Sequence, residues 1–349
     1  MLFCYVIIQK NFAGEIMAVE RTQKWDILKF FLIITVVVGH LTDFYLEESG
    51  ALKALCLGIY VFHMPLFIFV SGLFAKRTVN EKRKDKIAGY LALYFVIKFI
   101  LWLYSSIRYE KMNFRVLSEG GLPWFMFALF AFMLITIAVK DFSPRYVLPM
   151  SILVACLAGF DNSLGAYLSL SRIIVFYPFF YAGYILDPKK IEEHSKKPAA
   201  KVAAAFILIA FITLVVLFGE EYYSFRPLLT GINPFSTLGE YAKYGFMLRL
   251  AAYALAALTG YAFIVLTPGK TPLGIAAKYG RRTLSVYALH YIFIYILFYS
   301  FDIRTALYNV SPVWDEWLAM LLAIPIIFVC SLGVFDKIFS KIAVVPLKK

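Results

Sequence analysis

The chain has 349 residues, of which 62% are hydrophobic and 18% aromatic, and its mean hydropathy is +0.76. These values exclude an ordinary soluble domain and favour an all-α, polytopic membrane protein, because helices that cross lipid need long apolar runs. The formal net charge of +13 would suit a nucleic-acid partner, but the placement of the basic residues argues against nucleic acid.

Ten apolar segments are long enough to be predicted transmembrane helices, although the fifth and sixth are short. We expect the N-terminus to lie inside the cell, so that odd-numbered helices run outward and even-numbered helices run inward. The segments cover approximately 26–46, 53–75, 87–107, 122–139, 146–161, 170–186, 202–219, 245–266, 283–300 and 315–335.

The basic residues support this topology. Of the 35 Lys and Arg residues, 24 fall in the predicted inner segments, 7 in the outer segments and 4 within the helices. The asymmetry follows the positive-inside rule, so most of the positive charge is a topogenic signal. We therefore expect a multi-pass protein of the cell (plasma or inner) membrane, with both termini cytoplasmic, membrane lipid as a partner and no nucleic acid.

The predicted domains are a cytoplasmic N-terminal segment at 1–24, a ten-helix membrane domain at 25–336 and a basic cytoplasmic tail at 337–349. No cleavable signal peptide is evident before the first helix, and Met17 is an alternative start. The four cysteines lie in or beside apolar runs without metal-ligand spacing, so we expect buried free thiols and no metal. They are Cys4, Cys56, Cys156 and Cys330.

The first predicted helix carries two ionisable residues on one face. Lys29 and His40 are eleven residues apart, which is about three turns and about 16 Å along a helix. Ionisable groups are costly inside a membrane and usually mark function there. Asp43 follows one turn beyond His40 and either orients the imidazole and raises its basicity or is simply hydrated at the outer interface.

The second predicted helix contains His63 and Pro65, and Pro65 frees backbone groups that neighbouring side chains or water must satisfy. Ser71 and Gly72 near its end allow a close approach of another helix. Lys76 and Arg77 begin a dense basic cluster directly inside. This cluster binds anionic lipid or the phosphates of a soluble cofactor, or serves only as a topogenic signal.

Polar residues also mark three later helices. Arg172 and Arg249 begin the sixth and eighth helices from the outside, where they either snorkel to the surface or point inward to a substrate. In the ninth helix, Thr283, Tyr287 and His290 follow i, i+4, i+7 spacing, so they form one polar stripe that we expect to face the protein interior.

Several of these segments together resemble the membrane acyltransferase-3 family, whose members O-acylate carbohydrates. Lys29 and His40 match the family motif of Arg or Lys, ten residues, then His. The sequences His-Met-Pro-Leu-Phe and Val-Ser-Gly-Leu-Phe of the second helix resemble the branch that contains fucose 4-O-acetylases. Weaker similarities, which also agree in order and spacing, lie at 123–126, 177–184 and 285–290.

The resemblance implies a ten-helix acyltransferase domain and an acyl-CoA donor, usually acetyl-CoA, that enters from the cytoplasm. It also implies an acceptor hydroxyl on a glycan or lipid-linked sugar at the outer face. The appended extracellular hydrolase-like domain of larger members is missing from this sequence, so we expect the membrane domain itself to meet the acceptor.

We predict that His40 acts as general base on the acceptor hydroxyl or accepts the acyl group itself, and the sequence leaves both open. A proton-coupled transporter or flippase for an anionic or lipid-linked solute is the alternative function, with the same histidines as proton relays. The predicted residues are His40, His63, His290 and Asp43 for catalysis, Lys29, Lys76, Arg77, Ser71 and Tyr287 for acetyl-CoA, and Arg172, Arg249 and Trp124 for the acceptor.

Overall fold

A computed structural model describes residues 23–109, 114 and 121–346. Helices and the turns between them make up this part of the chain, and it contains no β-strand. The predicted all-α membrane protein is therefore confirmed. Residues 1–22 of the predicted N-terminal segment, with Cys4, lie outside the described residues.

Six helical segments of the described part are long and apolar enough to cross a membrane, or seven if a pair bent by 70° counts as one span. The six contain the N-terminal helix Gln23–Thr42, α2 (Gly50–Leu73), α4 (Lys84–Tyr109), α9 (Pro198–Phe218), α11 (Gly245–Leu266) and α13 (Thr283–Tyr295). The bent pair joins α15 (Asp315–Leu321) and α16 (Ala323–Cys330) to α17 (Gly333–Ile342).

Three shorter apolar helices complete the pattern: α5 (Trp124–Val139), α6 (Pro144–Ala158) and α7 (Leu170–Ile185). Each of the ten predicted segments thus overlaps an apolar helix, but ten spans and the inside-out orientation remain predictions. Short helices and turns connect the longer ones: α3 (Lys76–Asn80), α8 (Pro188–Ser195), η1 (Glu221–Phe225), α10 (Arg226–Thr230), η2 (Phe235–Tyr244), η3 (Pro272–Gly274), α12 (Ile275–Gly280), the π-helical turn η4 (Ile296–Ser300) and α14 (Ile303–Val310).

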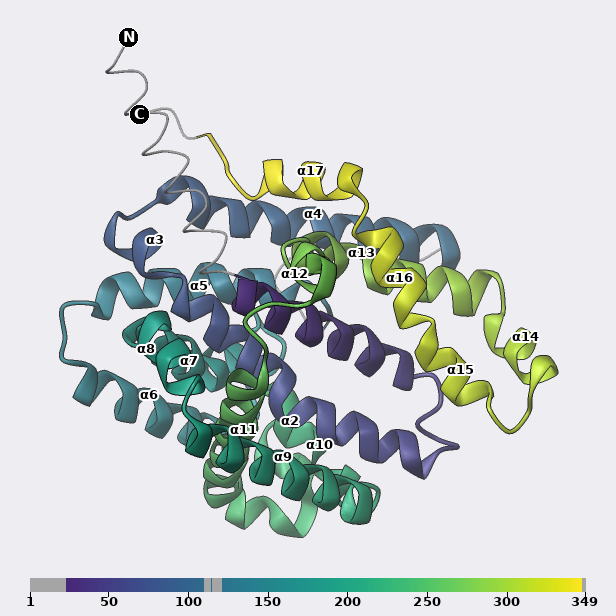
Figure 1. Ribbon diagram of the computed structural model, residues 1–349, viewed down its shortest axis with the longest axis horizontal. Helices are drawn as coiled ribbons and strands as arrows, with labels where there is room; N and C mark the ends of the chain where they lie inside the picture. The colour runs from purple at the N-terminus through teal and green to yellow at the C-terminus, as the bar shows by residue number, and fades with distance from the viewer. Residues whose placement is uncertain (1–22, 110–113, 115–120, 347–349) are drawn as a thin grey trace.

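Helix α2 lies at the centre of the molecule and packs against α7, α9 and α11 (Figure 1). Two glycines set its distance from α7. A Cβ at Gly72 would meet the backbone carbonyl of Phe180, and a Cβ at Gly183 would meet the backbone carbonyl of Phe69. Small residues of this kind let helix backbones approach closely in membranes, so the predicted close approach at Ser71 and Gly72 is confirmed.

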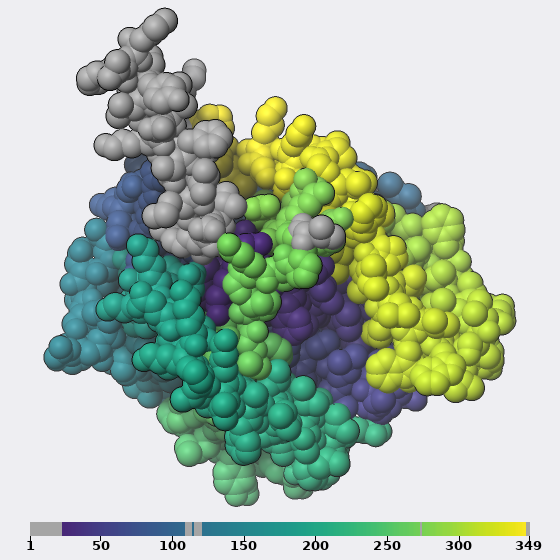
Figure 2. All heavy atoms as spheres, viewed as in Figure 1, coloured from purple at the N-terminus to yellow at the C-terminus, as the bar shows by residue number. Residues whose placement is uncertain are grey.

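The N-terminal helix, which carries Lys29 and His40, is also interior. Trp25 is 1% exposed, and its indole Nε1 donates a hydrogen bond to Glu192 at 2.6 Å. Gly280, at the end of α12, lies directly against the backbone carbonyl of Asp26. In the space-filling view the purple N-terminal helix is visible only between segments from later in the chain (Figure 2).

The α2–α7 contact can be tested with Gly72→Ala. The added methyl group would press on the Phe180 carbonyl, and overpacking of this kind costs about 1–3 kcal/mol. We expect a lower unfolding temperature in detergent. Gly260→Ala is the control, because its new Cβ would lie 3.6 Å from Leu66 in ordinary contact. Equal unfolding temperatures for the two variants would contradict the proposed role of Gly72.

Candidate active site

A cavity of about 270 Å³ collects polar side chains from the N-terminal helix, α2, α7, α10 and α13 and from the segment that opens α5. Because polar groups cannot face lipid without cost, their convergence on one internal cavity is the strongest indication of a functional site. The polar and aromatic residues of its lining include His40, Asp43, Tyr60, His63, Trp124, Arg172, Arg226, Tyr287 and Tyr291.

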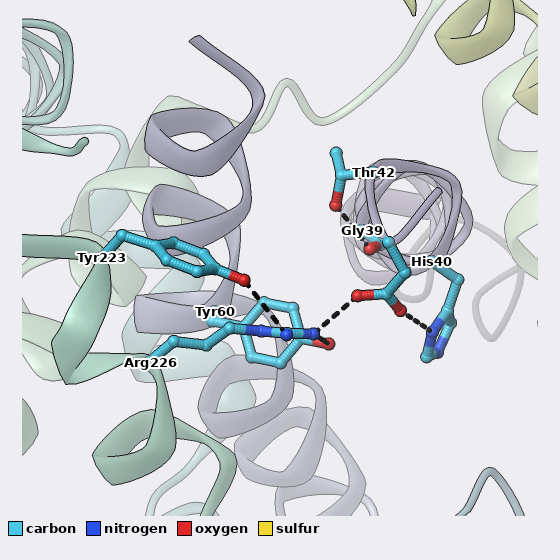
Figure 3. A network of polar contacts seen from close by, with 7 residues as sticks. Gly39, His40, Thr42, Tyr60, Tyr223 and Arg226 are labelled. Atoms are coloured by element: carbon cyan, nitrogen blue, oxygen red, sulfur yellow. Dashed lines mark hydrogen bonds and ion pairs between the residues drawn. The ribbon is translucent and has the colours of Figure 1, made fainter. Parts of the chain in front are cut away.

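The carboxylate of Asp43 lies between His40 and Arg226. Figure 3 shows His40 and Arg226 on the two sides of the unlabelled carboxylate that both contact. Its Oδ2 is 3.6 Å from His40 Nδ1, and its Oδ1 accepts a hydrogen bond from Arg226 at 2.7 Å. A separation of 3.6 Å is longer than a hydrogen bond, but catalytic contacts often tighten only when substrate is present. His40 Nδ1 is buried and has no hydrogen-bond partner among the described residues, so it is available to Asp43, and the predicted pairing of the two side chains remains a prediction.

Arg226, which comes from a distant part of the chain, binds the Asp43 carboxylate and two tyrosine hydroxyls. Its guanidinium also donates to the hydroxyls of Tyr60 and Tyr223, each at 3.1 Å, and lies 4.7 Å from the centre of the Tyr60 ring. Burial disfavours the charged form of Arg226, but the neighbouring Tyr60, Cys56 and Asp43 raise its pKa above the ordinary value. The cation therefore stays charged beside Asp43.

His63 and His290 are buried, and each places Nδ1 against a backbone carbonyl of its own helix. The distances are 2.7 Å from His63 to Ile59 and 2.9 Å from His290 to Val286. A carbonyl only accepts hydrogen bonds, so Nδ1 must carry the proton and a neutral ring keeps Nε2 as an acceptor. Both residues can thus accept a hydrogen bond from a hydroxyl group.

His290 lies next to His40 although it comes from α13. The two ring centroids are 5.4 Å apart, and Tyr291 contacts His40 at 4.8 Å. Nε2 of His290 is buried and has no hydrogen-bond partner among the described residues. Buried polar atoms are rarely left unpaired, so this nitrogen is available to a bound molecule or to His40.

Two of the three predicted acceptor residues meet at the cavity. The Arg172 guanidinium lies 4.8 Å from the centre of the Trp124 ring, and Arg172 Nε donates to the Thr230 carbonyl at 3.2 Å. Arg249 does not line this cavity. It is 2% exposed and donates to the Leu228 carbonyl at 2.6 Å, so it does not snorkel to the surface.

The predicted acetyl-CoA residues are not gathered at the cavity, with the exception of Tyr287, which donates to the Leu122 carbonyl. Each of the others has a local partner. Two of them form ion pairs: Lys29 with Asp26 at 2.6 Å and Arg77 with Glu81 at 3.0 Å. The other two donate to backbone carbonyls: Lys76 to Leu186 at 2.8 Å and Ser71 to Phe67 at 2.9 Å. Their role in donor binding remains a prediction.

Sequence reasoning missed Arg226, Tyr60 and Tyr291. Arg226 lies between the seventh and eighth predicted helices, in a segment that the predicted topology puts outside and in which it and Lys243 are the only basic residues. An isolated arginine in an apolar protein's loop is a weak signal, because no helical periodicity links it to Asp43.

The fold and the cavity define a polytopic membrane protein with an internal histidine site. The sequence model of the acyltransferase-3 family, described as an acyltransferase domain, matches residues 23–336. The chain therefore belongs to this family and is a membrane acyltransferase.

Two curated relatives match the chain, one over most of its length and the other over about half. The chain is 25% identical over 291 residues to the nodulation protein NolL of Sinorhizobium fredii (strain NBRC 101917 / NGR234). This alignment covers 77% of the chain and 76% of the relative. It is 22% identical over 183 residues to the nodulation protein NolL of Mesorhizobium japonicum (strain LMG 29417 / CECT 9101 / MAFF 303099), which covers 48% of each chain. No solved structure matches the chain.

The position of Asp43 can be tested through its distant partner. Arg226→Ala would leave the carboxylate unpaired and free to move from His40, and misplacement of a catalytic group costs about 10²-fold in rate. We expect acyl transfer to fall by this factor, with Lys243→Ala, an exposed cation of the same loop, unchanged. Arg226 and Asp43 share one network. The fold loss of acyl transfer in the double variant Arg226→Ala/Asp43→Asn should therefore be smaller than the product of the fold losses in the two single variants. Additive losses would show that the two residues act separately.

Proposed function

We propose that this protein transfers an acetyl group from cytoplasmic acetyl-CoA to a hydroxyl of an extracytoplasmic or lipid-linked sugar, in the cell membrane. The observation that carries the proposal is the cavity in which His40 faces Asp43 and lies beside His290. A histidine oriented by a carboxylate is suited to remove a proton from a hydroxyl group.

In the proposed reaction, Asp43 holds the Nδ1 side of His40, so Nε2 is the nitrogen that takes the acceptor proton. The deprotonated hydroxyl oxygen attacks the thioester carbon, the carbon–sulfur bond breaks and the thiol of coenzyme A leaves with the proton held by His40. Nε2 of His63 and Nε2 of His290 are hydrogen-bond acceptors while neutral, and we assign them to hydroxyl groups of the acceptor.

The acceptor side of the proposal rests on Trp124 and Arg172. An aromatic ring with a guanidinium over its face offers an apolar surface and several hydrogen-bond donors in one place. A sugar presents matching apolar C–H groups and hydroxyl oxygens. We therefore assign this wall of the cavity to the sugar.

The donor side rests on the N-terminal helix. Lys29 lies about 16 Å from His40 along the helix, toward the end that the charge distribution predicts to be cytoplasmic. We propose that Lys29, together with Lys76 and Arg77 of a predicted inner segment, attracts the phosphates of acetyl-CoA while the thioester reaches toward His40.

The decisive experiment is transfer of radiolabel from acetyl-CoA in sealed inverted vesicles. His40→Ala should reduce transfer to the glycan fraction by about 10²–10⁴-fold, the usual contribution of general acid–base catalysis. His194→Ala, a histidine exposed on α8, is the control and should keep full activity. Label on the wild-type protein itself would favour an acyl-histidine intermediate, and wild-type vesicles that consume no acetyl-CoA would favour the transporter.

The direction of transfer depends on the predicted orientation. Lys197 and Tyr222 are exposed residues in segments predicted to be inside and outside. We expect a membrane-impermeant maleimide to label Tyr222→Cys but not Lys197→Cys in intact cells. The three described native cysteines are buried, which limits background. Labelling of Lys197→Cys alone would reverse the orientation and with it the proposed side of acetyl-CoA entry.

A further inference from the structure

A second polar cavity lies beyond the end of the N-terminal helix, between the turn that follows this helix and the α14–α15 hairpin. Its volume is about 460 Å³. It is separate from the cavity of His40 and shares no lining residue with it. Its polar and charged lining residues include Tyr45, Glu48, Arg304, Tyr308, Asp315 and Glu316.

A buried hydroxyl group in this cavity lacks a partner. Tyr45 is 2% exposed, and its OH forms no hydrogen bond within the described part of the chain. The Arg304 guanidinium, which lines the same cavity, lies 5.0 Å from the centre of the Tyr45 ring and helps to hold it in place. Buried hydroxyls are normally hydrogen-bonded, so a fixed but unpaired phenol indicates a place for a polar ligand.

The charge of the cavity is negative. Arg304 pairs with Glu48, so these two charges offset each other. Asp315 and Glu316 form no ion pair among the described residues, and both are half-buried. The cavity thus has three carboxylates, Glu48, Asp315 and Glu316, against one guanidinium, Arg304. This excess of negative charge favours a ligand that carries a positive charge, and the cavity is far larger than a bare metal ion.

A row of aromatic rings runs from the cavity of His40 to Phe44, the sequence neighbour of Tyr45. Tyr291 contacts His40, and the rings of Tyr291, Tyr295 and Tyr299 follow one another with centroid distances of 4.4 and 5.4 Å. Phe44, between Asp43 and Tyr45, lies 5.5 Å from Tyr299. The second cavity is thus placed at the same end of the N-terminal helix as the proposed reaction.

We propose that this second cavity binds an amino sugar of the acceptor glycan, at a distance from the hydroxyl that is acetylated. The ammonium group would lie against Asp315 and Glu316, and a ring hydroxyl would pair with the OH of Tyr45. The inference rests on the proposed function for its biological role, but binding can be measured without any acyl transfer.

The test is saturation-transfer NMR of the purified full chain in detergent, with glucosamine as the probe and glucose as the neutral probe of the same size. A charged hydrogen bond is worth about a tenfold change in affinity or more, so glucosamine should bind at least about tenfold more tightly than glucose. Glu316→Gln should abolish this preference, and Tyr45→Phe should weaken binding of both sugars. Glu47→Gln, an exposed carboxylate next to the cavity, is the control and should bind as the wild type does.

His40→Ala separates this inference from the proposed function, because it should lose transfer and keep glucosamine binding. If the wild type transfers acetyl groups but binds both sugars equally, or if Glu316→Gln binds as the wild type does, the inference is wrong and the proposed function stands. Stabilisation by calcium that Glu316→Gln removes, without sugar binding, would replace the sugar site with a cation site. Glucosamine binding without acetyl transfer by the wild type would instead remove the proposed function.

Discussion

The carboxylate of Asp43 joins parts of the chain that no local rule brings together. It faces His40 on its own helix and accepts a hydrogen bond from Arg226, which lies 183 residues later. Arg226 is half-buried whereas Asp43 is exposed at the end of its helix, so the carboxylate supplies the counter-charge that a partly buried cation needs. This pair fastens the segment around α10 over the end of the N-terminal helix and thereby closes one wall of the cavity.

The remaining walls follow from how the helices approach one another. Gly72 and Gly183 bring the backbones of α2 and α7 into contact, which sets α2, with Tyr60 and His63, beside α7, with Arg172. The same lack of water that makes polar groups costly in lipid also orients the histidines, because Nδ1 of His63 and Nδ1 of His290 can each bind the carbonyl one turn earlier. Packing thus places the rings, and backbone hydrogen bonding selects the nitrogen that each presents.

Properties that depend on a single helix could be predicted from the sequence, because helical periodicity and hydropathy are local. The apolar segments, the one-turn separation of His40 and Asp43 and the burial of Tyr287 and His290 are of this kind. Contacts between distant segments could not be predicted, since they depend on how loops fold back. Arg226 on Asp43, His290 beside His40 and Arg249 on the Leu228 carbonyl are examples. For the same reason, proximity of Lys76 and Arg77 to Lys29 does not follow from their shared charge.

The protonation pattern of the cavity bears on why a hydroxyl is the expected partner. Nε2 of His63 and Nε2 of His290 accept hydrogen bonds while neutral, and Asp43 is an acceptor as well. A carbonyl compound would bring only further acceptors to these groups. A hydroxyl supplies the missing proton, and a molecule with several hydroxyls can satisfy more than one nitrogen at once. In the proposed reaction His40 takes a proton and the Asp43 carboxylate would stabilise the imidazolium, so one residue would both orient the base and offset the charge that the reaction creates there.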